Sequence, residues 1–125
     1  MGTWSTKISD NDAFQDIYQN FLELYNQGQN PADITKQILE DFSEMFSDYD
    51  ERNNSLFGLS LAQWETQSLE PAIFKQVKEI IESGNDLKFW TELGEKTIEK
   101  RRRELDKFLS KISTAREKPR RRVRS

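Results

Sequence analysis

The chain has 125 residues, 34% of them hydrophobic and 33% charged, which is enough for one domain with a modest core. It contains neither cysteine nor histidine, so disulfides, thiolate nucleophiles, sulfur-bound metals and the commonest general base are excluded. Residues 1–94 carry 17 acidic and 6 basic side chains (net −11), whereas residues 95–125 carry 5 acidic and 13 basic ones (net +8). This asymmetry predicts an acidic body with a basic C-terminal arm.

Apolar residues recur at steps of three and four along most of the chain, which predicts helices. The first is expected over residues 11–27, capped by Ser9 or Asp10 and ended by Gly28. The second begins at Asn30-Pro31, a cap followed by proline at the first helical position. Its apolar face extends through Phe46 to Tyr49, and the polar stretch SDYDERNN predicts a loop there.

The segment from Ser55 to about Gln67 is apolar on nearly every side, which predicts a buried central helix. Gly58 within it would allow another helix to approach closely. Three more helices are expected: one from Pro71 to Gly84, a short one over residues 85–94 and a last one over residues 95–112.

The sequence therefore predicts an all-α fold, a compact bundle of five to six helices over residues 1–113. Residues 114–125 are expected to form a disordered basic tail or linker, because they offer almost nothing apolar to bury. Trp64 and Trp90 lie at helical spacing and are expected in the core. No apolar run reaches the roughly 20 residues of a membrane span, and no secretory signal is visible, so we expect a cytoplasmic protein without membrane contact.

An acidic segment spans residues 40–51. Glu40, Glu44 and Asp48 are four residues apart, which places them on one face near the end of the second helix. Their mutual repulsion and the helix dipole both oppose local stability there, so one interpretation is a surface kept for a basic partner protein. The other interpretation is an ordinary solvated face. The candidate partner-binding residues are Asp41, Glu44, Asp48, Asp50 and Glu51.

The motif DYDERNNSLFGL begins like a calcium-binding loop but lacks its required residues. Arg52 takes a ligand position, Asn53 replaces the glycine, and Leu59 stands where a bidentate carboxylate is needed. The sequence also shows no phosphate-binding loop, nucleophile elbow or distinctive carboxylate pair. We therefore expect no metal site, no cofactor and no catalytic residues, and hence no enzyme.

The basic arm suggests a different partner. Lys100, Arg103, Lys107 and Lys111 form a stripe on the last helix, and more cations surround Pro119. Such an arm can neutralise phosphates, although it lacks interleaved aromatic residues for base stacking, and the acidic body repels nucleic acid. A linker or solubilising tail is the other interpretation. The candidate nucleic-acid-binding residues are Lys107, Lys111, Arg120, Arg121, Arg122 and Arg124.

The opening MGTW followed by DNDAFQDI resembles a family of small bacterial proteins of unknown function. Its members begin Met-Gly-x-Trp and continue with Asn-Asp-x-Ala, or a close variant, leading into a helix. The match is carried by Gly2, Trp4, Asn11, Asp12 and Ala13, while Ser5 stands where glycine is common. Weaker likeness covers LFGLSLAQWE, VKEIIESGNDLKFW and KRRRELDKFLSKI. The resemblance implies a helical fold with Trp4 as a structural plug, and supplies no activity. It also implies that EKPRRRVRS starts an interdomain linker.

These observations predict a non-enzymatic protein-interaction domain that binds a basic partner, in the manner of acidic inhibitors or immunity-type proteins that mask a basic toxin surface. The competing prediction is a nucleic-acid-associated protein that uses the basic arm. A third class, a small-molecule binder, requires a pocket that sequence does not show.

Overall fold

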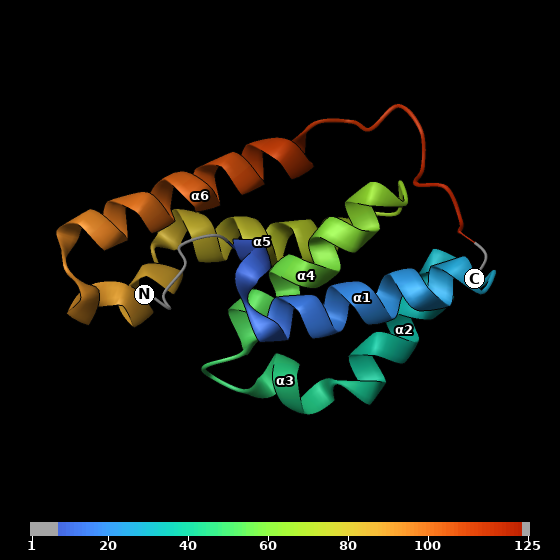
Figure 1. Cartoon of the computed structure of the whole chain (residues 1–125), viewed down its shortest axis with the longest axis horizontal. Helices are drawn as coiled ribbons and strands as arrows, with labels where there is room; N and C mark the ends of the chain where they lie inside the picture. The colour runs from blue at the N-terminus through green and yellow to red at the C-terminus, as the bar shows by residue number, and fades with distance from the viewer. Residues whose placement is uncertain (1–7, 124–125) are drawn as a thin grey trace.

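A computed structural model describes residues 8–123, apart from the side chains at positions 89 and 91–93. No strand occurs in this part of the chain, so the prediction of an all-α fold is confirmed. In Figure 1, α6 and α5 lie on one side of the bundle, α2 and α3 on the other, and α1 and α4 between them. The elements in chain order are η1 (Ile8–Asp10), α1 (Asp12–Asn26), α2 (Pro31–Asp41), α3 (Ser43–Ser47), α4 (Arg52–Glu65), α5 (Pro71–Ser83), η2 (Asp86–Leu93) and α6 (Glu95–Ser113).

Helix α4 is the centre of the bundle, as its all-round apolar pattern predicts. Leu56, Phe57 and Leu59 are buried on different sides of it, and its most extensive contact is with α1. The two helices come so close at Gly58 that a Cβ atom there would lie 2.5 Å from the Phe14 carbonyl oxygen. The glycine is therefore required by helix packing, and the helix that approaches it is α1.

Local sequence signals set most helix ends. The Asn30 side chain caps α2 by accepting the Ala32 N–H at 3.0 Å. Gly28 and Gly84 follow α1 and α5 with φ of +100° and +74°, as expected for glycine stops. The predicted cap of α1 is wrong, because Asn11, rather than Ser9 or Asp10, accepts the Phe14 N–H at 3.1 Å. Residues 8–10 form the preceding turn η1 instead.

The predicted continuous helix from Pro31 to Tyr49 is also wrong. It breaks at Phe42, where φ is −112° and ψ is 25°. The break lets the short helix α3 pack against α4 while α2 packs against α1. Phe42, Met45 and Phe46 then all lie against the core, so tertiary burial has overridden the local helical period.

A buried ion pair joins the last two elements. The Arg101 Nε and an Asp86 carboxylate oxygen are 2.7 Å apart, and both side chains are 2% exposed. Arg101 also donates to the Asn54 side chain at 3.1 Å, and its guanidinium lies 5.1 Å from the centre of the Trp90 ring. Trp90 and Trp64 are half-buried and each faces a cation. Trp64 packs against the core from its edge, so the expectation that both lie within the core is corrected to this extent.

The disordered tail is not confirmed. Helix α6 ends at Ser113, and residues 114–123, hereafter the C-terminal segment, continue without helix along the ends of α4 and α1 (Figure 1). None of the helices between residues 8 and 123 is long and apolar enough to cross a membrane. The expected structural plug Trp4 lies outside the described residues.

Candidate interaction surfaces

The five predicted acidic residues are all exposed, but they do not share one helix face. Asp41 ends α2 and Glu44 lies on α3, beyond the break at Phe42. Asp48, Asp50 and Glu51 form the turn before α4. The single stripe of Glu40, Glu44 and Asp48 was wrong because it required the continuous helix. The acids instead follow a bent segment around one edge of the bundle.

Asp48 has a structural part in this turn. Its Oδ1 accepts the N–H groups of Asp50 at 2.7 Å and Glu51 at 3.3 Å, and its carbonyl accepts the Arg52 N–H at 2.9 Å. An aspartate whose carboxylate accepts the N–H groups of the second and third residues after it is a common turn former. This tendency of aspartate to form turns was the sequence signal that could have predicted the Asp48 contacts, but the prediction from sequence rested only on the charge of Asp48.

Exposed apolar side chains accompany the acids. Tyr49 is 72% exposed between Asp48 and Asp50, and Leu39 is 37% exposed two residues before Asp41. Large apolar side chains with this exposure are few among residues 8–123, and Val123 is the other member of that group. The acidic segment therefore combines carboxylates with a protruding aromatic ring, which charge counting alone did not indicate.

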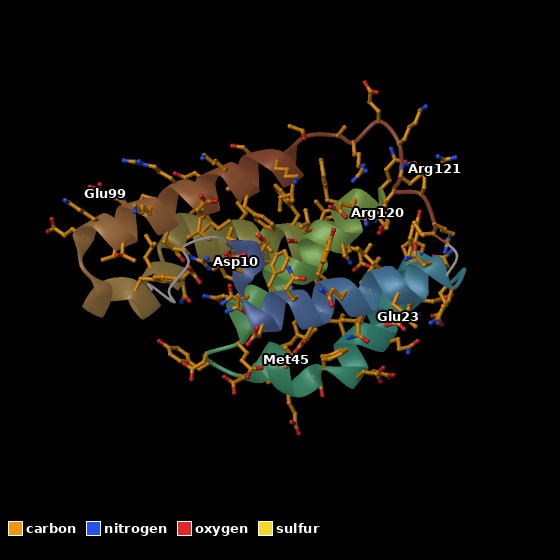
Figure 2. All side chains as sticks on the ribbon, viewed as in Figure 1. Asp10, Glu23, Met45, Glu99, Arg120 and Arg121 are labelled. Carbon is orange, nitrogen blue, oxygen red and sulfur yellow. The ribbon has the colours of Figure 1, made fainter. Side chains whose placement is uncertain are left out.

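The predicted basic residues are dispersed. Lys107 is exposed on α6, and the Lys111 ammonium lies 5.6 Å from the centre of the Trp64 ring. Figure 2 shows the Arg120 side chain directed toward the body and that of Arg121 directed away from it. Arg122 contacts the body again, and Arg124 lies outside the described residues. The five of these cations that lie within residues 8–123 are not brought together into one surface.

The first half of the C-terminal segment lies against the end of α4. The Trp64 indole N–H donates to the Thr114 carbonyl at 2.7 Å, and the Gln67 side chain donates to the Arg116 carbonyl. The Arg116 guanidinium lies 5.3 Å from the centre of the Trp64 ring. Trp64 thus contacts two cations and one carbonyl, which suits the cation-attracting face and the donor edge of an indole.

The second half lies across the ends of α4 and α1. The Arg120 Nη1 forms a 3.0 Å ion pair with Glu65, whose side chain is 12% exposed. The Arg120 N–H donates to the Glu65 carbonyl, and the Tyr25 hydroxyl donates to the Arg120 carbonyl, both at 2.6 Å. Arg122 donates to the carbonyl oxygens of Tyr25 and, at 2.9 Å, Gln29. Sequence reasoning missed all of these contacts.

Tyr18 completes the polar cluster around Glu65. Its hydroxyl donates to the Glu65 carboxylate at 2.6 Å. Burial raises the pKa of Tyr18 to about 12, and the hydrogen bond and the charge of Glu65 act in the same direction. The phenol therefore keeps its proton, and donates to Glu65, over a wide pH range.

The fold and these contacts define an all-α domain with an acidic edge and a bound basic segment. No protein-family model matches the chain, and comparison with curated proteins and with solved structures finds no significant match. The likeness to a bacterial family of unknown function stays a prediction.

Proposed function

We propose that this chain is a non-enzymatic, cytoplasmic protein-interaction domain that binds a basic partner protein through its acidic segment. The observation that carries the proposal is Tyr49, which is 72% exposed and lies between two aspartates. Tyrosine is enriched among the residues that dominate binding energy at protein interfaces. Surrounding carboxylates accelerate association with a basic surface and reject an acidic one.

The turn that carries Tyr49 supports this proposal through its rigidity. The two hydrogen bonds to the Asp48 carboxylate fix the backbone on both sides of the ring. A turn whose backbone is already held loses less conformational entropy on binding than a mobile loop does. An inhibitor or immunity-type role, in which the segment covers a basic surface of another protein, is the specific form of the proposal.

Nucleic-acid binding is supported less well by the contacts. Arg120 and Arg122, two of the six residues proposed for it, are engaged by Glu65 and by main-chain carbonyls. These guanidinium groups would have to leave their partners before they could neutralise phosphates.

The test is an affinity capture from the source organism's lysate, treated with nuclease and read by quantitative mass spectrometry. The baits are the native chain, the variant Tyr49→Ala, and the double variant Asp41→Lys with Glu44→Lys, which leaves the Asp48 turn intact. We expect a stoichiometric basic protein on the native chain. Its recovery should fall at least tenfold on both variants, since central aromatic side chains contribute about 2 kcal/mol or more to binding.

The matched control reverses two exposed acids elsewhere, Glu79→Lys on α5 and Glu99→Lys on α6, with the same change of net charge. This control should retain the partner. Equal losses on the control and on the acidic-segment variant would show that net charge alone governs capture, and would overturn the proposal. Recovery that disappears with nuclease would overturn it in favour of nucleic acid.

A further inference from the structure

The C-terminal segment occupies a groove between the C-terminal ends of α1 and α4. The residues of the groove that contact it are Tyr25, Asn26, Gln29, Trp64 and Glu65. We propose that this groove is a binding site for an arginine-containing protein segment with the pattern Arg-x-Arg, and that the chain's own Arg120 and Arg122 fill it in the absence of a partner. This site is distinct from the acidic segment, and its test does not depend on that proposal.

The groove recognises main-chain atoms, which identifies its ligand as a polypeptide. At Arg120 it contacts both main-chain groups, since the Glu65 carbonyl accepts the N–H and the Tyr25 hydroxyl donates to the C=O, each at 2.6 Å. Three residues on, the Asn26 side-chain oxygen accepts the Val123 N–H at 2.8 Å. Contacts of this kind supply affinity for an extended peptide, while side-chain subsites supply specificity.

The first side-chain subsite takes Arg120. The Glu65 carboxylate accepts from Arg120 Nη1 at 3.0 Å and from the Tyr18 hydroxyl at 2.6 Å. With the segment in place, the Glu65 side chain is 12% exposed and that of Arg120 is 41% exposed, so the pair is partly sheltered from water. A partly sheltered carboxylate that accepts a hydrogen bond from Tyr18 favours a cationic ligand over a neutral one.

The second subsite takes Arg122 and contains no carboxylate. The guanidinium lies 4.1 Å from the centre of the Tyr25 ring. It donates to the carbonyl of Tyr25, in the last turn of α1, and to that of Gln29, in the connection between α1 and α2. The Tyr25 carbonyl also accepts the Gly28 N–H, but it is one of the last carbonyls of α1, and these carry a partial negative charge that favours cations. A planar guanidinium can stack on the ring and donate to both carbonyls at once, which a lysine ammonium does less well.

The spacing of the two subsites accounts for the proposed Arg-x-Arg pattern. Side chains two residues apart in an extended chain point the same way, and the one between them points away. Accordingly Arg120 and Arg122 donate to groups of the body. The Arg121 side chain, by contrast, is directed away from the body (Figure 2), although Arg122 is exposed as well. The groove therefore places no requirement on the middle residue.

The resident segment leaves room in the groove. A hollow of about 770 Å³ lies beside Arg120 and Val123 against α1, and another of about 370 Å³ lies beside Arg116 and Trp64. A segment with larger side chains at these points would bury more surface than the chain's own residues do. An external segment can therefore compete with the resident one.

The share of molecules in which the resident segment, rather than an external peptide, fills the groove can be estimated. A tethered segment has an effective concentration on the order of 1 mM. If a free peptide of the same sequence binds with a Kd of about 0.1 mM, the resident segment fills the groove in about ten molecules of every eleven. Releasing the resident segment should therefore strengthen the binding of a free peptide about tenfold.

The experiment measures fluorescence anisotropy with a labelled synthetic peptide, TAREKPRRRV, which copies residues 114–123. It is titrated with the full-length native chain and with the full-length variant Arg120→Ala with Arg122→Ala, whose segment is released. The matched control is Arg102→Ala with Arg121→Ala, two exposed arginines whose loss changes net charge equally. We expect about tenfold tighter binding to the released variant and no change for the control.

Two further arms test the groove itself. In the released variant, adding Glu65→Gln or Tyr25→Phe should weaken peptide binding at least fivefold. The phenylalanine change removes only the hydroxyl that contacts Arg120, and circular dichroism establishes that each variant is folded. Alanine at the Arg121 position of the peptide should leave binding unchanged, whereas alanine at the Arg120 and Arg122 positions should abolish it.

Equal peptide binding by the native chain, the released variant and the control would overturn the proposal. Loss of affinity that depends only on the number of arginines in the peptide, and not on their positions, would also overturn it. In that case the attraction would be nonspecific electrostatics, which salt screens.

Discussion

Breaking the buried ion pair between Asp86 and Arg101 should destabilise the fold strongly, whereas replacing both residues should not. The perturbations are Asp86→Leu, Arg101→Met and the double variant. Each single change leaves one charge in a site where both side chains are 2% exposed. Uncompensated buried charge is far more costly than a missing surface contact.

The magnitude follows from the surroundings of the pair. A single change should lower the free energy of unfolding by about 3–5 kcal/mol, the usual cost of leaving one charge of a buried pair alone. The double variant removes both charges and leaves Asn53 and Asn54 with fewer hydrogen-bond partners, which costs about 1–3 kcal/mol. The two single changes together cost more than the double variant, so they should show a coupling energy of about 3 kcal/mol or more.

The assay is urea unfolding followed by circular dichroism. With an m-value of about 1–3 kcal/mol per molar urea, each single variant should shift the midpoint by 1 M or more. The control is Glu82→Gln, which breaks an exposed pair with Lys78 whose side chains are 50% and 58% exposed. Its effect should stay below about 0.5 kcal/mol.

Additive effects of the two changes would refute this reasoning. So would single variants that resemble the Glu82→Gln control. Either result would mean that the pair is hydrated in solution and that Asp86 does not anchor η2 to α6 by its charge.

Three other outcomes are expected. Gly58→Ala should lower the free energy of unfolding by about 1–3 kcal/mol in urea, because the new Cβ would meet the Phe14 carbonyl. A free energy of unfolding raised by about 1 kcal/mol would show instead that α1 and α4 can move apart. Ultraviolet titration should show one tyrosine that ionises near pH 12, and the variant Tyr18→Phe should lack this transition. The free energy of unfolding should fall between pH 10 and 12, because folded Tyr18 keeps a proton there that the unfolded chain loses. Asp48→Ala should lower the free energy of unfolding by about 0.5–2 kcal/mol, whereas Asp48→Asn keeps the acceptor oxygen and should lower it little, as measured by thermal melting. Equal effects of the two changes would show that this side chain does not stabilise the turn.

Features set by a few adjacent residues could be predicted from the sequence. Asn30-Pro31 and the glycines at positions 28 and 84 mark helix ends through backbone geometry alone, and the structure has them there. The break at Phe42 could not be predicted this way. No glycine or proline marks it, and it exists because α3 packs against α4, a contact between segments that the local period does not describe.

The position of Arg101 in the sequence indicated that it is buried, but this signal was not used. Arg101 lies four residues before Leu105, seven before Phe108 and eleven before Ile112, which is the spacing of the buried face of α6. A cation in phase with an apolar stripe requires a buried partner. The sequence could have raised that question, but the identity of Asp86 as the partner depends on how η2 folds back on α6.

The contacts of the C-terminal segment lay beyond sequence reasoning for a different reason. Arg120 and Tyr25 are separated by 95 residues, and the segment contains almost nothing apolar. A hydrophobic pattern cannot reveal binding that rests on guanidinium groups, carbonyls and one sheltered carboxylate. Only the relative placement of two helix ends creates that site.

Some of the opposite charges in the acidic and basic regions of the chain therefore stabilise the fold, while others stay available for partners. Arg101 with Asp86 and Arg120 with Glu65 both join the basic region to the acidic one, so some of the opposite charge holds the fold together. The acidic segment at α3 lies on the far side of the bundle from α6 (Figure 1). A basic protein bound around Tyr49 need not displace the C-terminal segment, whereas an Arg-x-Arg segment must. Binding at the two surfaces should consequently be independent, and charge reversal at Asp41 and Glu44 should leave the affinity of the released variant for the TAREKPRRRV peptide within about twofold, as expected for sites without shared contacts.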